Sequence, residues 1–108
     1  MYKIQVYLPP ESLRKIRKAV EQAGGGKIGN YEGCMSWWKV RSSRVTMDGA
    51  HPYHGEVGER TEAEEYILQC RVDEAHIEPV VRAIKKAHPY EEPVVDVVRL
   101  DEKSFLPV

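Results

Sequence analysis

The tripeptide His-Pro-Tyr occurs twice in this chain, and each copy is followed by further groups that can bind a metal ion. His51-Pro52-Tyr53 precedes His54, and His88-Pro89-Tyr90 precedes Glu91 and Glu92. Imidazole nitrogens and carboxylate oxygens are suitable ligands for divalent copper, zinc or nickel. If the two segments meet in space, the sequence predicts a divalent metal site formed by His51, His54, His88, Glu91 and Glu92.

A second interpretation of the histidines stays open. Their spacing is not a fixed ligand motif of the kind that paired Cys-x-x-Cys provides. His88 could instead cap the C-terminus of a helix, where a positive charge complements the helix dipole. His51 and His54 would then be solvated loop residues, and no metal would be bound.

The chain has two cysteines, which is too few for a disulfide-stapled scaffold and indicates reduced thiols in a cytoplasmic protein. Cys70 belongs to an apolar strand pattern and is expected in the core. Cys34 lies at the junction of a loop and a strand, so it is the candidate thiol ligand. Four further side chains are candidates to line a small-molecule pocket: Asn30, Tyr31, Tyr53 and Tyr90.

Other kinds of chemistry are disfavoured. The glycines of residues 24–29 follow an expected helix, whereas a phosphate loop runs from a strand into a helix. No serine lies in a nucleophile elbow, so we expect no enzyme, and phosphoester hydrolysis is a remote alternative. Sixteen basic and seventeen acidic residues give a net charge of -1, which argues against nucleic-acid binding. No apolar run approaches the roughly 20 residues of a membrane span, and no signal segment is visible.

An internal repeat predicts the elements that position these residues. At an offset of 64 residues, one alternating apolar pattern recurs, as expected for a strand with one buried face: Tyr2, Ile4, Val6 and Leu8 match Tyr66, Leu68, Cys70 and Val72. The same register continues into helical spacing: Leu13, Ile16, Ala19, Val20 and Ala23 match Ile77, Val80, Ala83, Ile84 and Ala87. Each half is therefore a strand followed by a helix.

A further strand is expected after each half, at Met35 to Thr46 and at Val94 to Leu100. The order predicts an α+β, ferredoxin-like βαββαβ fold in a single domain, 1–108, with strands one and three central. Both helices should cover one face of an antiparallel sheet. Residues 47–63 are expected to form a long functional loop. Asp73 is a candidate N-cap of the second helix, but Pro79 fits that helix only if it starts late or kinks.

The other face of such a sheet carries no helix. Its expected side chains are too apolar to ignore and too polar for a core: Lys3, Gln5, Tyr7, Ile67, Gln69 and Arg71. An interface between copies of the chain is the interpretation that we favour. The alternative is a structural or protein-interaction module that binds no ligand.

Four segments of the chain carry a family resemblance: YKIQVYLP, AGGGKIGNYEGC, GAHPYHGEVG and AHPYEEPVVDV. They resemble the small insert domain of the Nif-three-like (NGG-interacting-factor) proteins, and the HPYEEP string is similar to a C-terminal motif of the CutA divalent-cation tolerance proteins. The resemblance implies a CutA- and PII-like fold and a homotrimer. It also implies copper binding through His88 and a carboxylate at Glu91 or Glu92, whereas the cysteine of that site has no secure counterpart.

Overall fold

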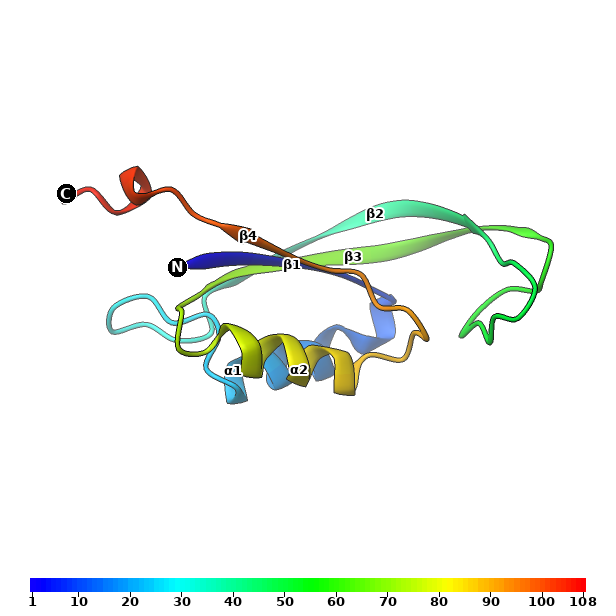
Figure 1. Ribbon diagram of the computed structural model, residues 1–108, viewed down its shortest axis with the longest axis horizontal. Helices are drawn as coiled ribbons and strands as arrows, with labels where there is room; N and C mark the ends of the chain where they lie inside the picture. Colours follow the sequence, from blue (N-terminus) through cyan, green and yellow to red (C-terminus); the bar gives the residue numbers. More distant parts are fainter.

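The computed structural model describes residues 1–108 as a four-stranded antiparallel sheet with two α-helices against one face (Figure 1). Its elements are β1 (Tyr2–Leu8), the 3₁₀ turn η1 (Pro10–Ser12), α1 (Leu13–Gln22), β2 (Met35–Val45), β3 (Arg60–Val72), α2 (Ile77–Ala87), β4 (Val95–Arg99) and η2 (Glu102–Phe105). The strand order is β2-β3-β1-β4. The predicted α+β fold, with strands one and three in the centre, is therefore confirmed.

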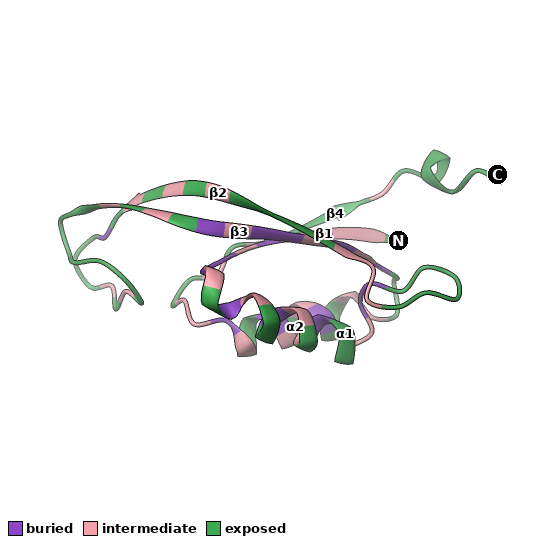
Figure 2. Cartoon of the chain, turned by 180° about the vertical axis from the view of Figure 1, so that it is seen from behind, coloured by how far each residue is buried: buried purple, intermediate pink, exposed green.

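The two halves of the repeat form one hydrophobic core. Its members come from corresponding positions of the two halves: Ile4, Val6, Leu8, Ile16, Val20, Leu68, Cys70, Val72, Val80 and Ile84. Figure 2 shows these buried residues along the central strands and on the sides of both helices that face the sheet. The amide nitrogen of Gln5 donates to the amide oxygen of Gln69 at 3.0 Å. Because these two glutamines are equivalent in the repeat and opposite in the register, they mark a pseudo-twofold axis between β1 and β3.

Glycine ends the first helix as the sequence predicts. Gly24 has φ +100°, a conformation that a side chain disfavours and that terminates helices. A Cβ at this position would clash with the imidazole of His76, so the glycine also allows the turn before α2 to approach the end of α1.

The second helix starts later than an N-cap at Asp73 would place it. The Asp73 carboxylate accepts the backbone N–H of His76 at 3.0 Å, so it closes a turn rather than opening the helix. Because α2 begins at Ile77, Pro79 occupies its first turn, where a missing N–H breaks no helical hydrogen bond. The late start resolves the conflict that Pro79 posed in the sequence.

The predicted loop at 47–63 is too long at its C-terminal end, because β3 begins at Arg60. Only Tyr66–Val72 of β3 pairs with β1, whereas Arg60–Cys70 pairs with β2. The outer halves of β2 and β3 therefore form a hairpin that extends past the helices (Figure 1). This part of β3 lacks an alternating apolar pattern because it contains several glutamates. The glutamates lie beside the basic strand β2. Arg41 is opposite Glu64, and the carboxylate of Glu64 lies 3.8 Å from the Lys39 ammonium. Opposite charges across strands favour such pairing.

The adjacent tryptophans of β2 lie on opposite faces of the sheet. Trp37 is in register with the core residue Leu68, and the Arg17 guanidinium of α1 lies 4.1 Å from the centre of its ring. Trp38 is in register with Ile67 on the face without helices. Trp37 and Trp38 are 39% and 40% exposed, so they offer a matched pair for testing the two faces. Neither helix has the length and hydrophobicity to span a membrane.

Candidate functional site

The two His-Pro-Tyr segments meet in space. The backbone N–H of His51 donates to a carboxylate oxygen of Glu91 at 2.8 Å. The rings of Tyr53 and Tyr90 lie with their centroids 5.8 Å apart at an angle of 50°, an arrangement typical of favourable aromatic pairs. The loop between β2 and β3 is thus folded back onto the segment between α2 and β4.

A pocket of about 500 Å³ opens where these segments meet the outer part of the β2–β3 hairpin. Its lining combines aromatic, charged and hydroxyl side chains: Tyr7, Ser42, Ser43, Arg44, Val45, Thr46, Met47, Ala50, Pro52, Tyr53, Glu65, Tyr90, Glu91, Glu92 and Val94. Tyr7, Ser42 and Glu65 have the strand register of the face without helices. A volume of this size suits a small organic ligand.

Glu65 and Tyr90 form a close polar contact in the wall of the pocket. The Tyr90 hydroxyl donates to a carboxylate oxygen of Glu65 at 2.6 Å, and Glu65 is 5% exposed. Burial of the ring, followed by this hydrogen bond, raises the pKa of the Tyr90 phenol well above its ordinary value. Tyr90 is therefore a neutral hydrogen-bond donor at any physiological pH.

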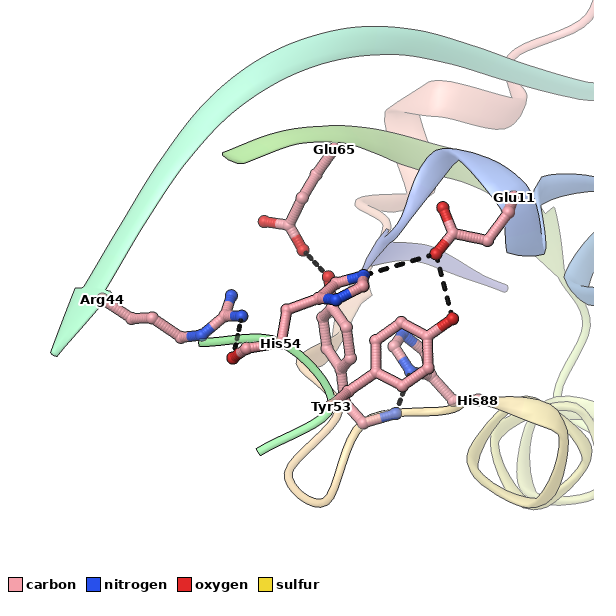
Figure 3. A network of polar contacts seen from close by, with 7 residues as sticks. Glu11, Arg44, Tyr53, His54, Glu65 and His88 are labelled. Atoms are coloured by element: carbon pink, nitrogen blue, oxygen red, sulfur yellow. Dashed lines mark hydrogen bonds and ion pairs between the residues drawn. The ribbon is translucent and has the colours of Figure 1, made fainter. Parts of the chain in front are cut away.

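A second network holds the folded-back loop in place (Figure 3). The Tyr53 hydroxyl donates to Glu11 at 2.9 Å, and the same carboxylate oxygen lies 3.5 Å from Nε2 of His54. The backbone N–H of Glu11 and the Tyr53 hydroxyl lower the pKa of the Glu11 carboxyl. Arg44 donates to the backbone carbonyl of His54 at 2.9 Å, so the loop is bound from η1 on one side and from β2 on the other.

His88 is a buried structural residue. Its Nε2 lies 2.6 Å from the backbone carbonyl of Tyr7, and its Nδ1 accepts the backbone N–H of Tyr90 at 3.2 Å. Nε2 must therefore carry the proton, because Nδ1 is an acceptor. Burial lowers the pKa of His88. The residue follows α2 as its C-cap, but it acts as a neutral ring and not as the cation that a dipole-capping role assumes.

The buried His88 is expected to make stability depend on pH. Its pKa in the folded chain lies below the ordinary value of 6.5, so the unfolded chain takes up a proton first as pH falls. The contribution of His88 to stability is complete above about pH 6.5 and is lost as pH falls toward the folded-state pKa. We expect the urea midpoint of unfolding to decrease from pH 7.5 to about pH 5, and His88→Gln to reduce that decrease. The amide nitrogen of Gln can still donate to Tyr7, so an unchanged pH dependence in this variant would contradict the assignment.

The candidate metal ligands do not converge in this chain. No three His, Cys, Asp or Glu side chains are grouped so that they could hold a metal ion. Both ring nitrogens of His88 are engaged with the backbone, and one His54 nitrogen lies near Glu11. Glu91 binds the backbone of His51. As they stand, these residues do not fit the copper site that the resemblance implies for His88 and Glu91 or Glu92.

Cys34 lies away from the His-Pro-Tyr segments. Its backbone N–H donates to Gly26, and it lines a second pocket of about 410 Å³ near the start of β1 with Lys3, Gln69 and Arg71. Cys70 lies in the core, and burial raises the pKa of its thiol to about 12, which makes it an unreactive apolar residue.

Asn30 and Tyr31 lie outside both pockets. Tyr31 is 73% exposed and forms a backbone bridge with Ile28 in the turn after α1. Of the four predicted pocket residues, Tyr53 and Tyr90 therefore line a pocket.

Among the residues of the site that were not found from the sequence are Glu11, Arg44, Thr46 and Glu65. The signal for Glu65 was the acidic run of residues 62–65 facing the basic run of residues 39–44, which indicates a hairpin with charged sides. Nothing in the local sequence distinguishes the buried Glu65 from its exposed neighbour Glu64. The contact of Glu11 with the loop joins positions 42 residues apart, and no local pattern predicts it.

Known proteins match this chain over part of their length. The chain is 35% identical over 100 residues to a GTP cyclohydrolase 1 type 2 homolog of Bacillus subtilis, covering 93% of this chain and 27% of the relative. It is 40% identical over 99 residues to the protein of that name in Mycobacterium tuberculosis, covering 88% of this chain and 25% of the relative. The chain thus spans about a quarter of these relatives. No protein-family model matches it.

Solved structures share the fold over nearly the whole chain. A Bacillus cereus protein related to NIF3 matches with a TM-score of 0.81 and 31% identity, over 94% of this chain and 26% of that protein. The PII-like protein CutA from Nostoc sp. PCC 7120 matches with a TM-score of 0.70 and 26% identity, over 98% of this chain and 86% of that protein. The chain therefore has a CutA- and PII-like fold and is similar to about a quarter of the length of NIF3-related proteins. The resemblance to NIF3-related proteins and the CutA- and PII-like fold that it implies are confirmed.

Proposed function

We propose that the chain is a homo-oligomeric binding module of the cytoplasm, a trimer being favoured, that holds a small ligand in the pocket between its two His-Pro-Tyr segments. The observation that carries this proposal is the meeting of those segments around a pocket of about 500 Å³. Two loops that are 40 residues apart in sequence and pack together around a pocket are typical of a ligand-binding site rather than of simple solvated connections.

The face without helices supports an oligomer. Trp38 and Val98 are 40% and 52% exposed there, and Ile67 lies in register between Trp38 and Tyr7. Apolar side chains on an uncovered sheet face commonly mark an interface, and tryptophan is among the residues that contribute most to one. The pocket residues Tyr7 and Glu65 share this face, which puts the proposed site beside the interface between subunits.

No enzymatic role is proposed. Tyr90 is neutral and Cys70 is buried, so neither provides a nucleophile, and no serine of the pocket has a histidine as its hydrogen-bond partner. The activity that the names of the longer relatives indicate belongs to proteins of which this chain covers about a quarter.

Calorimetry distinguishes a metal site from a small-molecule site. We expect copper, zinc and nickel to bind the wild type weakly, and a His51→Ala/His54→Ala double variant to lose whatever binding remains. The control is His88→Gln, which should bind these metals like the wild type because both ring nitrogens of His88 are already engaged. Tight stoichiometric binding of one metal that His88→Gln abolishes would overturn the small-ligand assignment and establish the metal site instead.

The second candidate function is a structural or protein-interaction module that uses the exposed sheet face, and the exposure of Trp38 favours it. That function requires no ligand. A panel of small molecules tested by ligand-observed NMR separates the two, because only the binding module gives signals that Tyr53→Leu weakens.

A further inference from the structure

The buried carboxylate of Glu65 has no positively charged partner in the chain. The protein has four ion pairs, at Lys39–Glu64, His54–Glu11, His76–Asp73 and Arg82–Glu78, and Glu65 is in none of them. Its hydrogen bond comes from the Tyr90 phenol, which is neutral. Buried carboxylates are normally paired with a cation, because the loss of hydration is otherwise uncompensated. The pocket wall therefore offers a negative charge that lacks its counterpart.

Three aromatic rings line the same pocket. Tyr7, Tyr53 and Tyr90 contribute to its lining, and Tyr53 and Tyr90 are in contact. The faces of aromatic rings are negative and attract cations, most strongly where water is displaced. Tyrosine rings beside a carboxylate therefore form a favourable binding environment for an organic cation.

The charged residues of the lining are predominantly acidic. Glu65, Glu91 and Glu92 oppose one guanidinium, that of Arg44. Arg44 already donates to the backbone of His54, and its guanidinium carbon lies 5.8 Å from the centroid of the Tyr90 ring. An anionic ligand would meet three carboxylates and an engaged arginine, so the charge of the pocket disfavours it.

From these three observations we propose that the pocket binds a small organic amine, whose ammonium group contacts Glu65 and whose apolar body packs against Tyr53 and Tyr90. This inference rests on the proposed function and specifies the ligand class of that site. A primary or secondary amine fits better than a quaternary ammonium, since only the former donates N–H hydrogen bonds to a carboxylate.

The test uses the full chain and the probe phenethylamine, with 2-phenylethanol and phenethyl-trimethylammonium as analogues. We expect the wild type to bind phenethylamine, the quaternary analogue to bind several-fold more weakly, and the alcohol at least about tenfold more weakly. Glu65→Gln should weaken phenethylamine binding at least about tenfold, because it removes the charge and keeps the size of the side chain. The matched control is Glu64→Gln on the adjacent exposed residue, which should leave the affinity unchanged.

One further variant tests the proposal independently of Glu65. Tyr53 is 43% exposed, so Tyr53→Leu should fold normally and bind the amine several-fold more weakly even if Glu65→Gln is unstable. Equal affinities of wild type and Glu65→Gln, or equal binding of the amine and the alcohol, would overturn the amine and leave the pocket as a site for another ligand. If none of the probes binds, the amine is wrong, whereas the proposed small-ligand function is wrong only if the broader panel of small molecules also gives no signal that Tyr53→Leu weakens.

Discussion

Leu68→Ala is expected to lower the free energy of unfolding by about 3–5 kcal/mol. Leu68 is fully buried at the centre of β3 and belongs to the core that both halves of the repeat share. Truncation loses the transfer free energy of the side chain and leaves a cavity that two helices and a sheet cannot readily close. The effect follows directly from the claim that one core holds both halves.

Urea unfolding at a fixed protein concentration measures this effect, because oligomerisation makes apparent stability depend on concentration. The control is Val97→Ala in the edge strand β4, where the side chain is 44% exposed and less apolar area is lost. We expect this variant to change stability by less than about 1 kcal/mol. Equal losses in both variants would show that the core is not where the structure places it.

Trp38→Glu is expected to dissociate the proposed oligomer. The substitution places a charge on the face without helices, at a residue whose ring is otherwise available to a second copy. Loss of a tryptophan from the centre of an interface and burial of an unpaired charge together should raise the dissociation constant at least about a hundredfold. Because Trp38 is exposed in the single chain, the subunit itself should remain folded.

Trp37→Glu is the matched control for this prediction. The two tryptophans are neighbours in sequence and nearly equal in exposure, but Trp37 lies on the helical side under Arg17. A glutamate at position 37 can pair with Arg17, so the oligomer should persist. Light scattering of both variants distinguishes a face-specific effect from general destabilisation, and dissociation of both to the same extent would contradict the assignment of the interface to one face.

Much of the fold could be predicted from the sequence because apolar residues at equivalent positions of the two repeat halves are buried in the same core. Ile4 and Leu68, or Ile16 and Val80, are buried for the same reason in each half: alternation in a strand and spacing of three to four residues in a helix. The start of β3 was missed because Glu62 and Glu64 belong to a hairpin that is stabilised by charge across strands, which an apolar pattern does not record.

The candidate site could be predicted only in part. The sequence left open whether the two His-Pro-Tyr segments meet; in the structure they do, and the candidate residues Tyr53 and Tyr90 line their pocket. The chemistry of His88 could not be predicted, because its role depends on the carbonyl of Tyr7, 81 residues away. A histidine in a sequence context typical of a metal ligand can thus have both ring nitrogens hydrogen-bonded to the backbone once the chain folds.

The mass of the wild-type protein in solution tests the central claim, that the uncovered sheet face joins copies of this chain beside a ligand pocket. Sedimentation equilibrium over a range of concentrations should give a multiple of the 12.4 kDa chain, with three copies expected. A single 12.4 kDa species at every concentration would contradict the account, since the face with Trp38 would then have no second copy to bind.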